Sequence, residues 1–325
     1  MRLLRKILSY ICLGCILWGG MSLGPRLPPD TGAYIAKKYD GWSGVLRAWI
    51  FSEWKASGNF NAWLNAAAAE FEKAHPGVYI EFEAVTAQAM QEDGMHPPDM
   101  KIFSYGTIDM DAAAIAMGGY VFVQNPSAAG TVIAPEHCGP LLAMYERQAI
   151  ELPEPGLDLG LPAMNSIEAI ETDENAFTRF MNGEVGWTIV DQAQLGRLDQ
   201  LRQSGRGPDW QCDARGGYSW CDQRLMLGIC ADGERGKLCE AFLEHLLTEE
   251  TQRGLASIGC FSPAGFAVHE DISPWREMEQ QMLGTRRLIP KPEHSGAALE
   301  DYVRKLSAGE ISAGQAAALL VQTCS

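Results

Sequence analysis

The sequence predicts an α/β protein made of two lobes. The chain has 325 residues, enough for two domains of ordinary size, and its 46% of hydrophobic residues can fill a core in each. Residues 45–82 contain the pattern of a strand, a helix and a second strand, a spacing that implies a right-handed parallel unit. Residues 225–247 repeat the order of a strand followed by a helix. These observations predict mixed or parallel sheets flanked by helices.

The first lobe begins with the strand–helix–strand unit. Residues 45–51 are rich in β-branched and aromatic side chains, which favours a strand. Apolar residues recur at helical spacing over 60–71, and the sequence His-Pro-Gly that starts at His75 ends this helix. Residues 78–83 alternate between apolar and polar side chains, as a strand with one buried face does. The apolar run at 100–103 predicts a further strand.

The middle of the chain carries less signal. Residues 126–172 are rich in Pro and Gly, and only 141–150 predict a helix there. The pattern returns with an amphipathic helix that Asn182 and Gly183 close, followed by a strand over 184–190.

A second strand–helix pair follows this region. The short apolar run at 225–230 is bounded by Ala-Asp-Gly, which predicts a buried strand. The helix after it places Leu238, Phe242 and Leu246 on one face. This face is expected to pack on a sheet.

Shorter helices complete the chain. Thr248 is expected to cap a helix over 249–257, which Gly259 ends. Two more helices are predicted over 295–306 and 312–323, after a proline-bearing segment. All of these elements are compatible with one α/β architecture.

The charge excludes one class of partner. The formal net charge is −15, and nucleic acid is not expected as a partner because phosphate binding needs clusters of Lys and Arg. Acidity does not identify a ligand, since it mostly affects solubility. The six histidines are dispersed along the chain, so no metal site and no cofactor is expected.

The chain contains nine cysteines. Seven of them lie beyond the N-terminal segment, an odd number, so at least one stays unpaired within a monomer. Cys212, Cys221, Cys230 and Cys239 are equally spaced, but this spacing matches no common zinc pattern. Cys212 and Cys221 are the pair expected to form a disulfide. Most of the cysteines are interpreted as buried apolar side chains.

Residues 1–24 predict a secretory signal or a short membrane anchor, and 25–43 a linker. The segment starts with basic residues and continues without any charge over 7–23. The sequence before Cys15 resembles a lipoprotein cleavage box, in which Cys15 would be the lipidated residue. An uncleaved anchor and ordinary cleavage near 22–24 are the alternatives. All three predict export, to the outer face of the cytoplasmic membrane or to an extracellular or periplasmic location.

Five segments of the chain carry, in order, a resemblance to a known family. They are FEKAHPGVYIEFE at 71–83, GGYVFVQN at 118–125, AFTRFMNGEVGWTIVDQAQL at 176–195, CEAFLEHLLTEETQ at 239–252 and LASIGCFSP at 255–263. The chain resembles the extracellular solute-binding proteins of bacterial ABC importers, in the large subgroup (family 1) of maltose-type and other sugar-binding proteins. The resemblance implies the two-lobed periplasmic-binding-protein fold of type II, with hinge strands between the lobes.

The resemblance also implies domains and partners. Lobe 1 would comprise residues 44–120 and 229–264, and lobe 2 residues 121–228 and 265–325. Gly118 and Gly119 would make the first crossing between the lobes flexible. The family function implies that the protein is a monomer that captures a small solute, a sugar or oligosaccharide first of all, in the cleft between the lobes. It would deliver this solute to the permease subunits of an ABC transporter, without catalytic residues.

The ligand is expected where strands end, because open α/β sheets bind ligands beyond the carboxyl ends of their strands. A sugar needs flat apolar surfaces for its C–H faces and amide or carboxylate groups for its hydroxyls. The residues predicted from this chemistry and from the resemblance are Ser52, Trp54, Tyr105, Trp187, Asp191, Trp220 and Ser295. Each aromatic residue among them has core packing as its alternative role.

Two other functional classes compete with this prediction. A secreted enzyme acting on carbohydrate would need paired carboxylates, and 41 acidic residues offer too many pairs to test from sequence. The chain has no G-x-S-x-G elbow, no H-E-x-x-H motif and no P-loop, which disfavours the common hydrolase and nucleotide-binding classes. A module that presents its ligand to a sensor is the other alternative.

Overall fold

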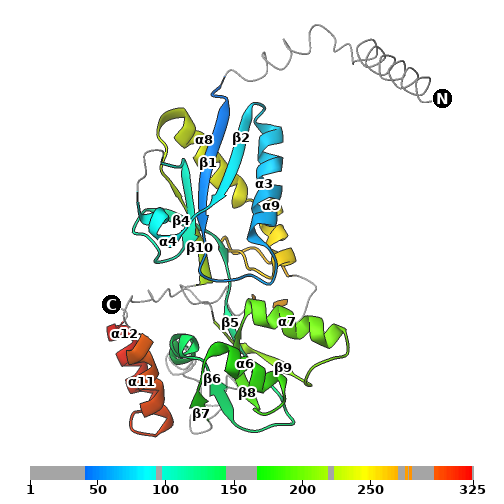
Figure 1. Cartoon of the computed structure of the whole chain (residues 1–325), viewed down its shortest axis with the longest axis vertical. Helices are drawn as coiled ribbons and strands as arrows, with labels where there is room; N and C mark the ends of the chain where they lie inside the picture. Colours follow the sequence, from blue (N-terminus) through cyan, green and yellow to red (C-terminus); the bar gives the residue numbers. More distant parts are fainter. Residues whose placement is uncertain are drawn as a thin grey trace, which may run out of the picture.

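The strands form two five-stranded sheets that lie end to end (Figure 1). The structure is a computed structural model and describes residues 41–92, 97–143, 167–218, 223–269, 275–276, 278–279 and 296–323. Each sheet has its own helices and its own buried side chains. The predicted two-lobed α/β architecture is confirmed.

The first sheet has the strand order β2-β1-β3-β10-β4. Its strands are β1 (Gly44–Phe51), β2 (Val78–Ala84), β3 (Met100–Ser104), β4 (Ala112–Met117) and β10 (Arg224–Ile229). β1 pairs in parallel with β2 and β3, and β10 runs antiparallel to β3 and β4. The predicted parallel unit at 45–82 is therefore present, and the sheet as a whole is mixed.

One face of the first sheet is covered by helices. α3 (Phe60–Ala74) begins at Asn59, whose side chain accepts a hydrogen bond from the Asn61 amide. α8 (Gly233–Leu246) packs beside it, and the two helices bury a core with alternate residues of β1 and β3. α9 (Glu249–Arg253) and the short helix η4 (Gly254–Ile258) follow, and Gly259 ends them with φ 64°. The predictions for this region are confirmed.

The second sheet has the strand order β7-β6-β8-β5-β9. Its strands are β5 (Tyr120–Gln124), β6 (Thr131–Ile133), β7 (Ile167–Ile170), β8 (Trp187–Asp191) and β9 (Gln211–Tyr218). β6 is parallel to β7 and β8, whereas β5 is antiparallel to β8 and β9. The predicted strand at 184–190 begins three residues later than expected and extends to Asp191.

Helices pack on both faces of the second sheet. They are η1 (Pro135–His137), α6 (Asp173–Met181), α7 (Gln192–Gln203), α11 (Gly296–Ser307) and α12 (Ala313–Thr323). α6 and α7 lie on the face that carries Val121 and Val123, and α11 and α12 lie on the face that carries Phe122. The helix predicted at 141–150 begins earlier, at Cys138, and the structure describes it as far as 143. The two C-terminal helices were predicted almost to the residue.

The chain passes between the sheets at Gly118 and Gly119, between β4 and β5. By sheet membership the return occurs before β10, because Arg224–Ile229 pairs entirely within the first sheet. This differs from the expected lobe boundary at 228/229, since β10 is a strand of the first sheet and not a crossing between the lobes. The assignment of the remaining residues to lobes stays a prediction.

A further connection lies beside the first one. Met117 and Phe261 form an antiparallel bridge, with backbone distances of 3.0 and 2.8 Å between their N and O atoms. Gly118 N also donates to the Gln223 carbonyl over 2.7 Å. We call residues 117–120, 223–224 and 260–262 the junction.

No helix within the described ranges is long and apolar enough to cross a membrane. The signal or anchor predicted at 1–24, the linker over 25–40 and the lipidation site at Cys15 lie outside the described residues.

Candidate ligand-binding site at the junction of the two sheets

The parallel strands of both sheets end at the junction. In the first sheet, Ser104 at the end of β3 pairs with Leu225, one residue after the start of β10, and β1 and β2 run parallel to β3. In the second sheet, Asp191 at the end of β8 pairs with Tyr120, the first residue of β5. β6 and β7 run in the direction of β8. The carboxyl ends of two sets of parallel strands therefore face the same region, which is where α/β proteins bind ligands.

The first sheet contributes two serine hydroxyls and an aromatic ring. Ser104 Oγ accepts a hydrogen bond from the Glu53 amide at 2.8 Å, and Ser52 Oγ donates to the Trp54 carbonyl at 2.8 Å. Tyr105 is half-buried and packs against the core of the second sheet that contains Phe122. These contacts order the loops that follow β1 and β3, and a hydroxyl retains capacity for another hydrogen bond.

The second sheet contributes a polar network. Gln194 Nε2 donates to both carboxylate oxygens of Asp173, at 2.8 and 2.9 Å. The Asp191 carboxylate accepts from the Gln194 amide at 2.8 Å, and the Gln194 side chain accepts from the Asp191 amide, so the two residues form the capping box of α7. His137 Nε2 lies 3.7 Å from Asp173 Oδ1, and the Tyr120 ring meets the imidazole edge to face at 5.3 Å. The network joins residues that follow β6, β7 and β8.

The setting of His137 favours the neutral form of its imidazole. Burial removes the imidazole from water and lowers its pKa below the usual 6.5, while the nearby carboxylates of Asp173 and Glu136 act in the opposite direction. Its Nδ1 atom is buried and has no hydrogen-bond partner among the described residues. A buried polar atom of this kind is costly, so it marks a place where a ligand atom or a water molecule would be favourable.

Gln192 ties the second sheet to a loop of the first. Its side chain is fully buried; Oε1 accepts from the Gly119 amide at 3.1 Å and Nε2 donates to the Lys55 carbonyl at 2.8 Å. A Cβ atom on Gly118 would lie 2.5 Å from the Gln192 side-chain amide, so glycine is required for this close approach. A second tie is made where Gln223 Nε2 donates to the Tyr120 hydroxyl at 3.0 Å.

The structure separates the residues that the sequence groups together. Ser52, Tyr105 and Asp191 lie at strand ends facing the junction. Trp54 is buried in the core of the first sheet, where its ring contacts Phe60 edge to face at 4.8 Å and its indole nitrogen has no partner among the described residues. The packing role that was the alternative for this tryptophan is thus observed, while the ligand role stays a prediction.

Trp187 lies at the opposite end of β8 from Asp191. It pairs with Gln124, at the end of β5 far from the junction, and contacts the Phe122 ring edge to face at 6.2 Å. Asp191 lies four residue positions further along the strand, which corresponds to about 13 Å. Two of the other predicted binding residues, Trp220 and Ser295, lie outside the described residues.

The sequence analysis missed Tyr120, His137, Asp173 and Gln223. Tyr120 belongs to an apolar strand and reaches the site because it is the first residue after the crossing. His137 lies in the stretch 126–172, which has little periodicity, and Asp173 is the first residue of α6. Each follows a β-strand within four residues, and this position at a strand end is the signal that could have identified them.

The described cysteines behave as apolar side chains where they are buried. Burial raises the pKa of the Cys138 and Cys239 thiols to about 12 and also raises that of Cys260. The Cys212–Cys221 disulfide stays a prediction, because Cys221 and the side chain of Cys212 are not described. Within the described residues there is no group of three or more His, Cys, Asp or Glu side chains suited to a metal ion.

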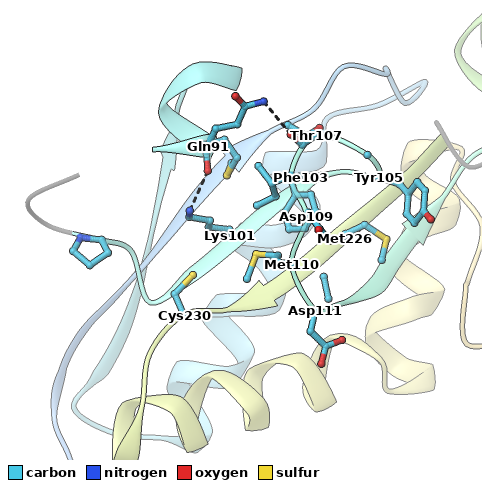
Figure 2. Close-up of a pocket in the computed structure, with 15 residues that line it drawn as sticks. Gln91, Lys101, Phe103, Tyr105, Thr107, Asp109, Met110, Asp111, Met226 and Cys230 are labelled. Atoms are coloured by element: carbon cyan, nitrogen blue, oxygen red, sulfur yellow. Dashed lines mark hydrogen bonds between the residues drawn. The ribbon is translucent and has the colours of Figure 1, made fainter. Parts of the chain in front are cut away.

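A pocket of about 1100 Å³ lies away from the junction network, on the other face of the first sheet (Figure 2). Phe103, Lys101 and Met226 project from β3 and β10 on the face opposite the core. α4 (Ala87–Gln91), the segment 105–111, Pro97, Ala112 and Cys230 also line it, and Tyr105 reaches toward the second sheet. We call this space the outer-face pocket.

Comparison with known proteins establishes the fold. No family model and no curated protein matches the chain. A cyclic alpha-maltosyl-1,6-maltose binding protein from Arthrobacter globiformis has a similar structure, with TM-score 0.57 and 11% identity over 87% of this chain and 98% of that one. An ABC substrate-binding protein from Listeria monocytogenes in complex with cycloalternan matches with TM-score 0.50 and 12% identity over 86% of this chain and 98% of that one.

These similarities confirm the fold class. The protein has the two-lobed periplasmic-binding-protein fold of type II, with a mixed sheet and flanking helices in each lobe. The resemblance found in the sequence segments is thus matched by a resemblance of the whole structure to ABC substrate-binding proteins.

Proposed function

We propose that this protein is an extracytoplasmic solute-binding subunit of an ABC importer, which captures a sugar or oligosaccharide at the junction and delivers it to permease subunits. The observation that carries this proposal is the convergence of the carboxyl ends of both sets of parallel strands at one polar region. In such a fold a ligand can contact both lobes at once, so ligand binding favours the closed arrangement of the lobes.

The junction has the parts that hinge closure requires. Gly118 and Gly119 lie between β4 and β5, and the Met117–Phe261 bridge holds a second segment beside them. Among the described residues, the side chains of Gln192 and Gln223 make hydrogen bonds at this junction. Rotation about the junction would break these contacts and expose the network around Tyr120 and His137 to a solute.

The chemistry of the junction suits a polyhydroxylated ligand. The network offers carboxylate, amide, hydroxyl and imidazole groups, which can bind sugar hydroxyls in both donor and acceptor roles. Tyr105 and Tyr120 supply aromatic surface for the C–H faces of a ring. The two similar structures named above are, by their names, a binding protein for a cyclic maltosyl sugar and a complex with cycloalternan, and this supports the choice of oligosaccharides.

A binding screen tests the proposal. Intrinsic tryptophan fluorescence and thermal unfolding of the purified protein would be recorded against linear and cyclic gluco-oligosaccharides, with polyamines and metal ions as contrasting classes. Saturable binding of one sugar class is expected, with the sugar recovered intact by chromatography. Turnover of the sugar would favour the secreted-enzyme alternative, and binding of a polyamine or metal ion instead would overturn the sugar assignment.

The site can be located by substitution. Tyr120→Leu and His137→Leu change side chains of the network and are expected to weaken sugar binding at least tenfold, because each removes a polar group from a buried site. Glu250→Gln on the remote helix α9 is the matched control and should leave the affinity unchanged. Equal affinities for all of these variants would place the ligand elsewhere.

A further inference from the structure

The outer-face pocket is a built cavity, separate from the junction network. Its roof, α4, is fastened at two points: Lys101 Nζ donates to the Met90 carbonyl at 3.0 Å, and Gln91 Nε2 donates to the Thr107 carbonyl at 3.3 Å (Figure 2). The first bond joins the roof to the floor strand β3, and the second joins it to the wall segment. The pocket therefore has a defined floor, roof and wall.

The floor of the pocket is shaped by a glycine. Gly228 lies on the pocket face of β10, opposite Lys101 of β3. A Cβ atom at this position would lie 2.6 Å from the sulfur of Met110, so the thioether rests in the space that a side chain would fill. Met90 and Met226 also line the pocket. Methionine side chains adapt to ligands of different shape and make favourable contacts with aromatic rings.

The charges of the pocket are unequally placed. The Lys101 side chain is 6% exposed, and its ammonium bonds the roof and lies 6.0 Å from the centroid of the Trp49 ring. It is thus directed at α4 and β1. Asp109 and Asp111 also line the pocket, are exposed, and have no ion pair with another described residue. The charges that a bound molecule can reach are therefore mainly negative.

We propose that the outer-face pocket is a second binding site, which takes a small organic cation with an aromatic or alicyclic body. In the proposed complex the body packs among Phe103, Met110 and Met226, and the cationic group lies near Asp109 and Asp111, which also line the pocket. The volume of about 1100 Å³ is slightly above the range of about 300–1,000 Å³ that is usual for small-molecule sites, so a small cation would fill only part of it. This proposal does not rest on the sugar proposed for the junction, although Tyr105 lines the pocket and also faces the junction.

Three fluorescent probes with one body and different charge test the proposal: 9-(aminomethyl)anthracene, 9-anthracenemethanol and 9-anthracenecarboxylate. Direct titration of the full chain is expected to show that the cation binds about five- to tenfold more tightly than the alcohol, with the carboxylate weakest, because two exposed carboxylates each contribute modestly. Equal affinities for the three probes, or no binding up to millimolar concentration, would overturn the proposal.

Paired variants separate local from general charge effects. The double variant D109N/D111N should abolish the preference for the cation over the alcohol. The control E234Q/E250Q removes the same charge from α8 and α9 and should retain the preference. If both doubles lose it equally, the preference comes from the net charge of the protein, and the proposed role of Asp109 and Asp111 is wrong.

Two further variants locate the probe. Ala112→Phe fills the pocket and Met110→Lys adds a positive charge to it, so the first should weaken all three probes about fivefold or more and the second mainly the cation. Asp191→Ser, at the junction, should leave all three affinities unchanged. The exposed thiol of Cys230 also lines the pocket, so the bound cation should slow its alkylation, measured by peptide mass spectrometry. Unchanged alkylation together with an unaffected Ala112→Phe variant would exclude this pocket.

Discussion

The two sheets differ in how their faces are covered. In the second sheet, Tyr120 and Phe122 of β5 are buried in one core, and Val121 and Val123 are buried in another on the opposite face. In the first sheet, alternate residues of β1 are buried under α3 and α8, whereas Val45, on the outer face, is 45% exposed. Only the short helix α4 and the segment 105–111 pack on that outer face among the described residues.

This difference separates two kinds of binding surface. The middle residues of β5 and β8 are buried, so these two strands can offer functional groups only where they end. Tyr120 and Asp191 occupy such ends. The first sheet has an open face as well, and there Lys101, Phe103 and Met226 line a pocket. One architecture thus supports a site at the strand ends and another on a sheet face.

The largest effect is expected from Phe122→Ala in β5. Phe122 is fully buried at the centre of the second sheet, so its removal leaves a cavity and should lower the free energy of unfolding by about 3–5 kcal/mol. Urea denaturation measures the change. A matched pair sharpens the comparison: Val123→Ala should cost about 1–3 kcal/mol and Val45→Ala less than about 0.5 kcal/mol. Similar costs for the two valines would break the distinction between covered and open faces.

The next effect concerns the tie between the lobes. Gly118→Ala places a methyl group where the Gln192 side chain lies, so Gln192 must leave Gly119 N and the Lys55 carbonyl. We expect a loss of about 2 kcal/mol, because buried polar groups lose their partners. Thermal and urea unfolding measure it. Gly314→Ala in α12 is the control, since Gly314 is exposed and a Cβ atom there meets nothing within 4 Å. A cost equal to that of Gly118→Ala would show that the loss does not come from the Gln192 hydrogen bonds.

Acid is expected to destabilise the protein through two buried histidines. Burial lowers the folded-state pKa of His137 and of His269, the latter against a backbone bond to Cys260 and the charge of Glu279. Below about pH 6.5 the unfolded chain therefore binds protons that the folded chain does not, and stability falls as pH decreases. Each histidine contributes at most about 1.4 kcal/mol per pH unit. Well above the unfolded-state pKa, both imidazoles are neutral in the folded and in the unfolded chain, so they no longer make stability depend on pH.

Urea unfolding at pH 7.5 and pH 5.5 tests this pH dependence. His137→Gln should have a smaller loss of stability between the two pH values than the unsubstituted protein, whatever its stability at pH 7.5. The same comparison for His269→Gln measures the contribution of His269 to the pH dependence. The ring of His269 lies 5.1 Å from that of Phe261, which belongs to the junction. An unchanged difference in both variants would show that neither histidine is the cause.

The smallest effect separates capping from ligand binding at Asp191. Asp191→Ala removes the cap of α7 and should cost about 1 kcal/mol, whereas Asp191→Ser keeps a capping oxygen and should cost less. Urea unfolding measures both. If Asp191 also binds the solute, as predicted from sequence, both variants should lose sugar affinity equally. A loss of affinity in Asp191→Ala alone would assign it a structural role only.

Much of the fold was predictable because the signals are local. The strand–helix–strand unit at 45–82 was predicted from alternation, from helical spacing and from the helix end at His75, whereas the cap at Asn59 was not predicted. The cap at Thr248 and the glycine end at 259 were likewise predicted and observed. Such features depend on residues within one or two turns of each other, which a single sequence displays directly.

The site residues could not all be predicted from the sequence, because they are distant from one another in the chain. Tyr120, His137, Asp173 and Gln223 come together only through the order and register of the second sheet and the return of the chain before β10. Asp191 and Trp187 belong to one short strand, yet the pairing of β8 with β5 puts only Asp191 at the junction. The sequence by itself determined the elements with strong local patterns, such as the unit at 45–82, but it did not reveal β4, β6, β7, β9 or α7. The non-local pairing of the strands decided which side chains meet.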